Sequence, residues 1–239
     1  EKATRKEFPE GISPSGTDAL RFTFCALATN GRDIRFDVGR LEGYRNFCNK
    51  LWNATRFVMM NCENQIIEYS GAELHPVNSL IVNQLSCAIQ QVHQWLKEYR
   101  FDLMAHTLYE FTWNQFCDWH LEFAKVILQS GQFSKEVESQ TRWVLVIVVE
   151  ILLRLLHPVI PFITEELWQQ LKPYSKQTSD SILLASYPKQ LPEFFLSNSQ
   201  PILIVKNIIV AIRTLRSESN VSPSKKISLY VAKGCCEEK

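Results

Sequence analysis

The sequence has little glycine and almost no excess of charge of either sign. Only eight of its 239 residues are glycine, and none of them form the GxGxxG or GxxxxGK[ST] loops that cradle nucleotide phosphates. The 26 basic and 25 acidic side chains give a formal net charge of +1. These absences exclude a phosphate loop within the chain and a broad electrostatic attraction for nucleic acid, so any nucleic-acid site must be a local patch.

Long hydrophobic runs and a disulfide framework are also missing. The most apolar stretch, residues 143–156, is interrupted by two charged residues and is shorter than the roughly 20 residues that span a bilayer, so we expect a buried helix and no membrane partner. Seven cysteines without regular spacing favour a reducing, cytoplasmic location. Cys117 and His120 lie three residues apart, but no second pair completes a zinc site, and we predict no metal.

The most informative pattern present is a helix over residues 45–57, RNFCNKLWNATRF. At roughly 100° per residue, its polar side chains fall within about 140° of arc. This polar face has three cations, three asparagines, no carboxylate and an aromatic edge: Arg45, Asn46, Asn49, Lys50, Asn53, Arg56 and Phe57. The opposite arc predicts a core seam of Leu41, Tyr44, Cys48, Leu51, Thr55, Val58 and Met59. Amides, guanidinium groups and an aromatic flank suit RNA phosphates and unpaired bases, although an ordinary polar face is an alternative from periodicity alone.

Caps and helix breakers along the chain predict an all-α bundle, because Ser, Thr and Asp favour helix starts, proline favours a first turn, and glycine favours a stop. The first three expected helices run from Thr17 or Ser15 to about Ala28, from an Asp37 cap through the polar face, and from Pro76 past Leu96. The next two run from an Asp102 cap to Gly131 and from Ser134 to Leu156. The last two begin at Pro161, with a Thr164 cap and an end near Leu171, and at Pro201.

The chain is expected to have three parts: residues 1–36, a helical bundle over 37–172, and a tail over 173–239. In the tail, residues 173–198 read as a connector crossing the bundle surface. The helix after Pro201 is expected to turn its isoleucines inward. Residues 226–231 alternate at period two, which predicts a small strand that requires a partner.

Several segments resemble, in order, the valyl-tRNA synthetase family (valine–tRNA ligases) of the class I aminoacyl-tRNA synthetases. They are GTDALRF at 16–22, GRDI at 31–34, the 45–57 helix, FCDWHLE at 116–122 and LHPVIPFITEELW at 156–168. The resemblance implies the anticodon-binding bundle of class Ia enzymes, preceded by a stem-contact segment over 1–36.

The implied parent enzyme charges tRNA(Val) with valine using ATP and Mg²⁺. The HIGH and KMSKS signatures of the family's ATP site are absent from this sequence. The resemblance therefore implies that the catalytic and editing domains lie upstream as partners in the same chain. It also implies that this fragment is non-catalytic and holds no cofactor.

The resemblance further implies that the bundle holds the anticodon loop and stem of tRNA(Val), mainly reading the second and third anticodon bases. On the polar face it implies base stacking or edge contact by Arg45, edge hydrogen bonds by Asn49 and Asn53, and phosphate contacts by Lys50 and Arg56, with Asn46 and Phe57 as neighbours.

In the leading segment, Arg21, Arg32 and Arg35 are implied to contact the inner side of the tRNA or to brace the active-site loop. Ordinary ion pairs with Asp18 or Asp33 are the alternative.

Elsewhere two carboxylates leave their roles open. Asp118 and Glu122 either pair with Lys125 or orient a cation of the polar face. His157 reads as a helix-end residue, because no nucleophile motif accompanies it. The rivals to the valine assignment are the isoleucyl- or leucyl-tRNA synthetase counterpart and a helical protein-interaction module without RNA function.

Overall fold

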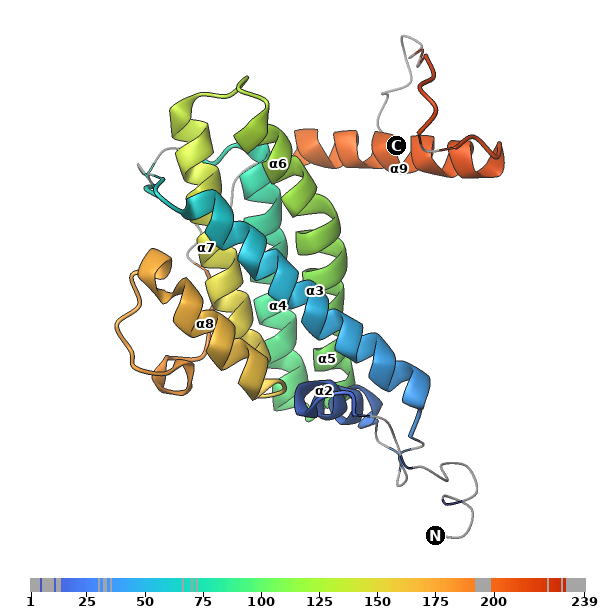
Figure 1. Cartoon of the computed structure of the whole chain (residues 1–239), viewed down its shortest axis with the longest axis vertical. Coiled ribbons are helices and arrows are strands. Elements are labelled where there is room, and N and C mark those ends of the chain that lie inside the picture. The colour runs from blue at the N-terminus through green and yellow to red at the C-terminus, as the bar shows by residue number, and fades with distance from the viewer. Residues whose placement is uncertain are drawn as a thin grey trace. The chain divides into compact units, whose positions relative to one another are not determined.

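The expected all-α class is confirmed by a computed structural model of the chain (Figure 1). It describes residues 5, 11, 14–29, 31, 34, 36–65, 67–69, 71, 73–191, 199–222, 224–228 and 230. The chain divides into two compact units, residues 1–199 and residues 200–239. Over the described positions of both units the regular elements are helices, and no strand occurs.

In chain order, the first helices that the structure describes in full in the larger unit are α2 (Thr17–Leu27), α3 (Val38–Cys62) and α4 (Pro76–Lys97). α2 packs against both α3 and α5, and α4 packs against α5 and α7. In Figure 1, α2 lies at one end of the bundle, and α3 runs diagonally across its front.

The starts of these helices follow the sequence signals in two of three cases. The Asp37 carboxylate caps α3 by accepting hydrogen bonds from the Gly39 and Arg40 amides at 2.9 and 3.3 Å, as predicted. Pro76 is the first residue of α4, also as predicted. The predicted cap of α2, Thr17 or Ser15, was wrong, because the N-cap residue is Gly16. Its φ of 90° is one that glycine adopts readily, and because glycine has no side chain, no side-chain hydrogen bond caps the helix.

The next helical stretch contains an unexpected π-helix. α5 (Phe101–Glu110), the π-helix η1 (Phe111–His120) and α6 (Leu121–Gln129) follow one another without a break. The predicted Asp102 cap was wrong, because the N-cap residue is Arg100. Asp102 lies in the first turn and instead accepts two hydrogen bonds from the Arg100 guanidinium at 2.9 and 2.7 Å.

The last part of the larger unit holds α7 (Lys135–Leu156), α8 (Pro161–Ser175) and a short 3-10 helix, η2 (Ile182–Leu184). α7 begins where predicted, and Ser134 is its N-cap residue, because its hydroxyl accepts from the Val137 amide at 3.3 Å. The predicted Thr164 cap of α8 was wrong. Thr164 lies inside the first turn, and its hydroxyl donates to the carbonyl of Ile160, the N-cap residue, at 2.8 Å.

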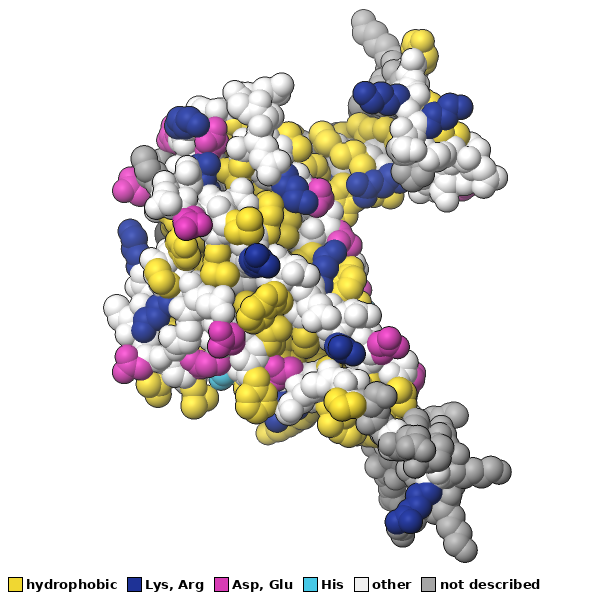
Figure 2. Space-filling view, viewed as in Figure 1, with side chains coloured by type: hydrophobic (Ala, Val, Ile, Leu, Met, Phe, Trp, Pro, Cys, Tyr) yellow, Lys and Arg dark blue, Asp and Glu magenta, His cyan; other side chains and the backbone are white. Residues whose placement is uncertain are grey.

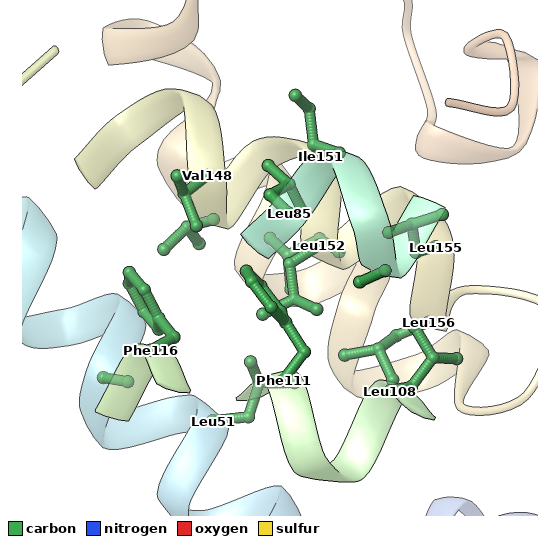
Figure 3. Packing of buried hydrophobic residues seen from close by; sticks show 14 of the residues in the cluster. Leu51, Leu85, Leu108, Phe111, Phe116, Val148, Ile151, Leu152, Leu155 and Leu156 are labelled. Atoms are coloured by element: carbon green, nitrogen blue, oxygen red, sulfur yellow. The ribbon is translucent and has the colours of Figure 1, made fainter. Parts of the chain in front are cut away.

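The hydrophobic core lies where α3, α4, α5, η1 and α7 face one another, and its leucines, valines and phenylalanines interdigitate in Figure 3. The core also contains a buried carboxylate, that of Glu150, and both of its oxygens accept hydrogen bonds. Trp168 of α8 has no exposed surface, and its indole N–H donates to Glu150 at 3.2 Å. Glu150 also accepts two hydrogen bonds from Arg154 at 2.8 and 2.7 Å, which offsets the cost of burying its charge.

The smaller unit contains α9 (Gln200–Glu218). Within this unit no residue of α9 is buried, so the expected inward face stays a prediction. The expected strand is also not observed: residues 226–228 and 230 have no regular structure, and residues 229 and 231 lie outside the described residues. A strand needs a partner for its backbone hydrogen bonds, and no strand occurs elsewhere in the described ranges.

Candidate nucleic-acid interface

The polar face of α3 is turned to solvent, as its periodicity predicts. Arg45, Asn46, Asn49, Asn53 and Arg56 are exposed, whereas Lys50 and Phe57 are partly buried. In Figure 2 cations on this side of the larger unit are dispersed among polar and hydrophobic side chains and do not merge into one basic patch. The face is thus a local strip, in keeping with the balanced net charge.

The buried side of α3 is rotated from the predicted seam. Leu41, Leu51, Thr55 and Val58 are buried as expected. Tyr44, Cys48 and Met59 are only partly buried, and three residues outside the predicted seam are buried in their place: Phe47, Ala54 and Cys62. The large ring of Phe47, packed between Phe22 and Tyr109, sets the depth to which this side of the helix sinks.

Lys50 is held in place by residues of the π-helix. Its ammonium donates to Asp118 at 2.8 Å and lies 5.0 Å from the centre of the Trp113 ring. The hydrogen bond from Asp118 raises the pKa of Lys50, so its positive charge is retained. Asp118 therefore orients a cation of the polar face, which was one of the two alternatives left open by the sequence.

Aromatic rings extend this arrangement beneath Lys50. Trp113 stacks on Tyr109 with ring centres 5.6 Å apart and planes 13° apart, and Tyr109 stacks on Phe47 at 5.2 Å and 25°. Sequence reasoning did not include Trp113 in the site. Its place depends on the π-helix, for which the sequence carries no pattern that we recognise.

A second contact joins the other end of the polar face to α6. The Lys125 ammonium lies 5.5 Å from the centre of the Phe57 ring and donates to Glu122 at 2.6 Å. For Glu122 the structure thus shows the other alternative, the i,i+3 pair with Lys125. Lys125 adds a positive charge beside α3 that the α3 sequence alone does not contain.

The remaining five polar side chains of the face have no protein partner among the described residues. Within the described part of the chain, no hydrogen bond or ion pair engages the side chains of Arg45, Asn46, Asn49, Asn53 and Arg56. Arginines elsewhere in the bundle are committed: Arg100 to Asp102, Arg142 to Glu138 and Arg154 to Glu150. The α3 face thus presents donors that the fold itself does not use.

Among the three stem-contact candidates, the structure describes only Arg21, because Arg32 and Arg35 lie outside the described residues. Arg21 does not form the alternative ion pair with Asp18. Its guanidinium donates to the carbonyls of Val159 and Pro158 at 2.9 and 3.0 Å.

Asp18 also binds the segment between α7 and α8, at the first turn of α8. Its carboxylate accepts from the amides of Phe162 and Ile163, at 3.3 and 2.7 Å, and so caps α8 from a distant part of the chain. α2 therefore holds the turn between α7 and α8 through two charged side chains.

The other side chains considered for chemistry have structural surroundings. His157 Nδ1 lies 2.8 Å from the Thr164 hydroxyl, as expected for a helix-end residue. Burial raises the pKa of the Cys117 thiol to about 12, which keeps it protonated. No cluster of three potential metal ligands occurs over the described positions, and none of the helices described there is long and apolar enough to cross a membrane.

These features define an all-α bundle domain that presents one uncommitted strip of cations and amides. The family model described as "Anticodon-binding domain of tRNA ligase" matches residues 78–231, which is more than half of the chain. The chain belongs to this family. The anticodon-binding domain that the sequence resemblance implied is therefore confirmed.

The chain is also similar to proteins that are named valine–tRNA ligases. The chain is 49% identical over 233 residues to a valine–tRNA ligase of Legionella pneumophila strain Lens, covering 96% of the chain and 25% of that protein. It is 51% identical over 241 residues to a valine–tRNA ligase of Coxiella burnetii, covering 98% of the chain and 26% of that protein. The chain thus spans about a quarter of the length of these relatives.

A solved structure shares the fold. It is the ternary complex of Agrobacterium radiobacter K84 agnB2 LeuRS with tRNA and LeuAMS, with a TM-score of 0.53 and 18% identity. The similarity covers 82% of this chain and 21% of that one. At this identity it supports the fold alone.

Proposed function

We propose that this chain is the tRNA-recognition part of a valine–tRNA ligase and that it holds the anticodon loop and stem of tRNA(Val). The family match and the valine–tRNA ligase relatives support the assignment. The rest of the ligase would bind ATP and Mg²⁺ and charge the tRNA, and the whole enzyme would work in the cytoplasm. This chain would contribute recognition and no catalytic group.

The observation that carries the proposal is the set of unpartnered side chains along α3. Sequence-specific RNA recognition uses unpaired bases, whose edges accept and donate hydrogen bonds and whose faces stack on guanidinium or aromatic planes. Arg45, Asn49 and Asn53 supply such groups, and they are exposed. Lys50 and Arg56 supply positive charge for the phosphates, with Lys50 already positioned by Asp118.

In the leading segment, Arg21 would act by fixing the α7–α8 turn, and direct contact with the inner side of the tRNA by Arg21, Arg32 and Arg35 stays a proposal. Asn46 and Phe57 would line the same surface as the α3 donors. A protein-interaction module without RNA function predicts instead that tRNA does not bind in a salt-dependent way.

The test is a titration of the chain with tRNA(Val), and with the same tRNA altered at the second anticodon base, over a series of salt concentrations. We expect weaker binding of the altered tRNA. We also expect that Arg56→Ala lowers the slope of log affinity against log salt by about 1, as loss of one phosphate contact does.

Lys97→Ala is the matched control, because it removes an exposed cation of another helix and should leave the slope unchanged. Equal binding of the two tRNAs would contradict anticodon reading by these residues. The absence of any salt-dependent binding would favour the interaction module.

A further inference from the structure

A surface pocket, called the hollow below, lies at the α2 end of the bundle. It has a volume of about 470 Å³, within the size range of small-ligand sites. Its walls come from three distant parts of the larger unit: residues 14–19, α3 at Arg45, Cys48 and Asn49, and α8 at Phe162. Because Arg45 and Asn49 also belong to the polar face of α3, the hollow is continuous with the proposed tRNA-binding surface.

The aromatic wall of the hollow is exposed although its backbone is fixed. Phe162 is 65% exposed. Its amide donates to Asp18, so the first turn of α8 is held in place while the ring remains accessible. A large aromatic side chain at a pocket wall offers a flat apolar surface to a ligand.

The rest of the lining combines an apolar floor with polar edges. Ala19 is buried and Cys48 is partly buried, and desolvation raises the pKa of the Cys48 thiol to about 12, so this side of the hollow carries no charge of its own. Arg45 and Asn49 supply a cation and an amide without protein partners among the described residues. The carboxylate of Asp18, the acidic member of the lining, is committed to the α8 backbone.

We infer that this hollow receives one unpaired nucleotide of the bound tRNA, with its base against Phe162 and its edge at Asn49 and Arg45. A nucleobase has two apolar faces and a polar edge, which matches an aromatic wall, a neutral floor and an amide. A base within a duplex cannot enter, because its faces are covered by its neighbours; a splayed base of a loop can. This inference rests on the proposed tRNA-binding function and adds Phe162 as a residue that holds a base.

The first experiment compares tRNA(Val) affinity for the unaltered chain, Phe162→Leu and Phe162→Tyr. Leucine keeps an apolar side chain but removes the ring, so we expect binding to weaken by about 5- to 100-fold, the range found when a base loses an aromatic partner. Tyrosine keeps the ring and should bind within about twofold of the unaltered chain. Tyr99→Leu is the control, because Tyr99 is an exposed aromatic residue outside the hollow.

The second experiment identifies the nucleotide. Each unpaired position of the tRNA is replaced in turn by an abasic nucleotide, and affinity is measured with the unaltered chain and with Phe162→Leu. At one position the two losses should fail to add, as expected for groups in direct contact.

The outcomes separate this inference from the proposed function. Salt-dependent tRNA binding that is unaffected by Phe162→Leu would overturn the nucleotide pocket and leave the proposed function intact. Additive losses at every abasic position would also overturn the pocket, because Phe162 would then act without touching a base. If the unaltered chain bound no tRNA, both would fall.

Discussion

Removal of the Asp18 carboxylate should destabilise the bundle more than removal of an ordinary helix cap. The carboxylate accepts two amides of the first turn of α8, at 3.3 and 2.7 Å, across a sequence separation of 144 and 145 residues. In Asp18→Ala these amides lose their acceptor in a partly buried place. Loss of a cap costs about 0.5–2 kcal/mol, and a buried donor without a partner costs about 1–3 kcal/mol. Because both figures describe the same lost hydrogen bonds, we expect a cost near their upper ends, about 2–3 kcal/mol.

The matched comparison is Asp37→Ala, which removes the local cap of α3. The two Asp37 hydrogen bonds are exposed, so water replaces the lost acceptor and the expected cost is about 1 kcal/mol. Asp18→Asn keeps one acceptor oxygen and should fall between the two. The assay is denaturant unfolding followed by circular dichroism, with melting temperature as a second measure; Asp18→Ala should lower it by about 4–12 °C.

A loss for Asp18→Ala no larger than that for Asp37→Ala would refute this reasoning. It would mean that Arg21, which binds the Val159 and Pro158 carbonyls, holds the α7–α8 turn without help from Asp18.

Two further predictions concern buried charge. His120 is buried, and desolvation lowers its pKa from 6.5 to about 3, so between these values the unfolded chain binds a proton at His120 and the folded chain does not. The free energy of unfolding should therefore fall by about 2 kcal/mol from about pH 7.5 to about pH 5. His120→Phe should reduce that fall by the same amount, as measured by denaturation at a series of pH values. An identical pH profile for the variant would contradict a buried neutral imidazole. Glu150→Gln should cost about 3 kcal/mol because it leaves Arg154 and Trp168 without a buried anion, whereas Asp118→Asn should cost less than about 1 kcal/mol because the Lys50–Asp118 pair is 35% and 44% exposed. Comparable losses of unfolding free energy in the two variants would show that burial does not decide the strength of these pairs.

The parts of the fold that the sequence predicts are those whose donor and acceptor lie close together in the chain. Asp37 and Ser134 cap helices whose amides follow within three residues; the Asp37 cap and the start of a helix at Ser134 were both predicted. Pro76 marks its helix by its own backbone geometry. The exposure of the polar side of α3 follows from the helical period, so five of the seven predicted residues of this face are exposed and the other two, at its margin, are partly buried.

The features that the sequence does not predict depend on residues brought together by folding. The acceptor for the α8 amides comes from Asp18, far away in the chain, and a Thr164 cap was predicted in its place. The core side of α3 is shifted toward Phe47 because Tyr109 and Phe22 offer it ring contacts. Residues 226–231 alternate between apolar and polar side chains, but the strand that this pattern predicts is not observed, and no other strand that could pair with it occurs in the described ranges.

The π-helix between α5 and α6 also governs how this part of the chain tolerates a change in length. Its i→i+5 hydrogen bonds enclose one more residue per turn than those of an α-helix, so a deletion within Phe111–His120 can be absorbed by reverting a turn to α geometry. The same deletion inside α4 would swing one half of the helix by about 100° relative to the other and turn its buried face outward. Residues 111–120 are therefore a place where the loss of one residue leaves the faces of the flanking helices in phase.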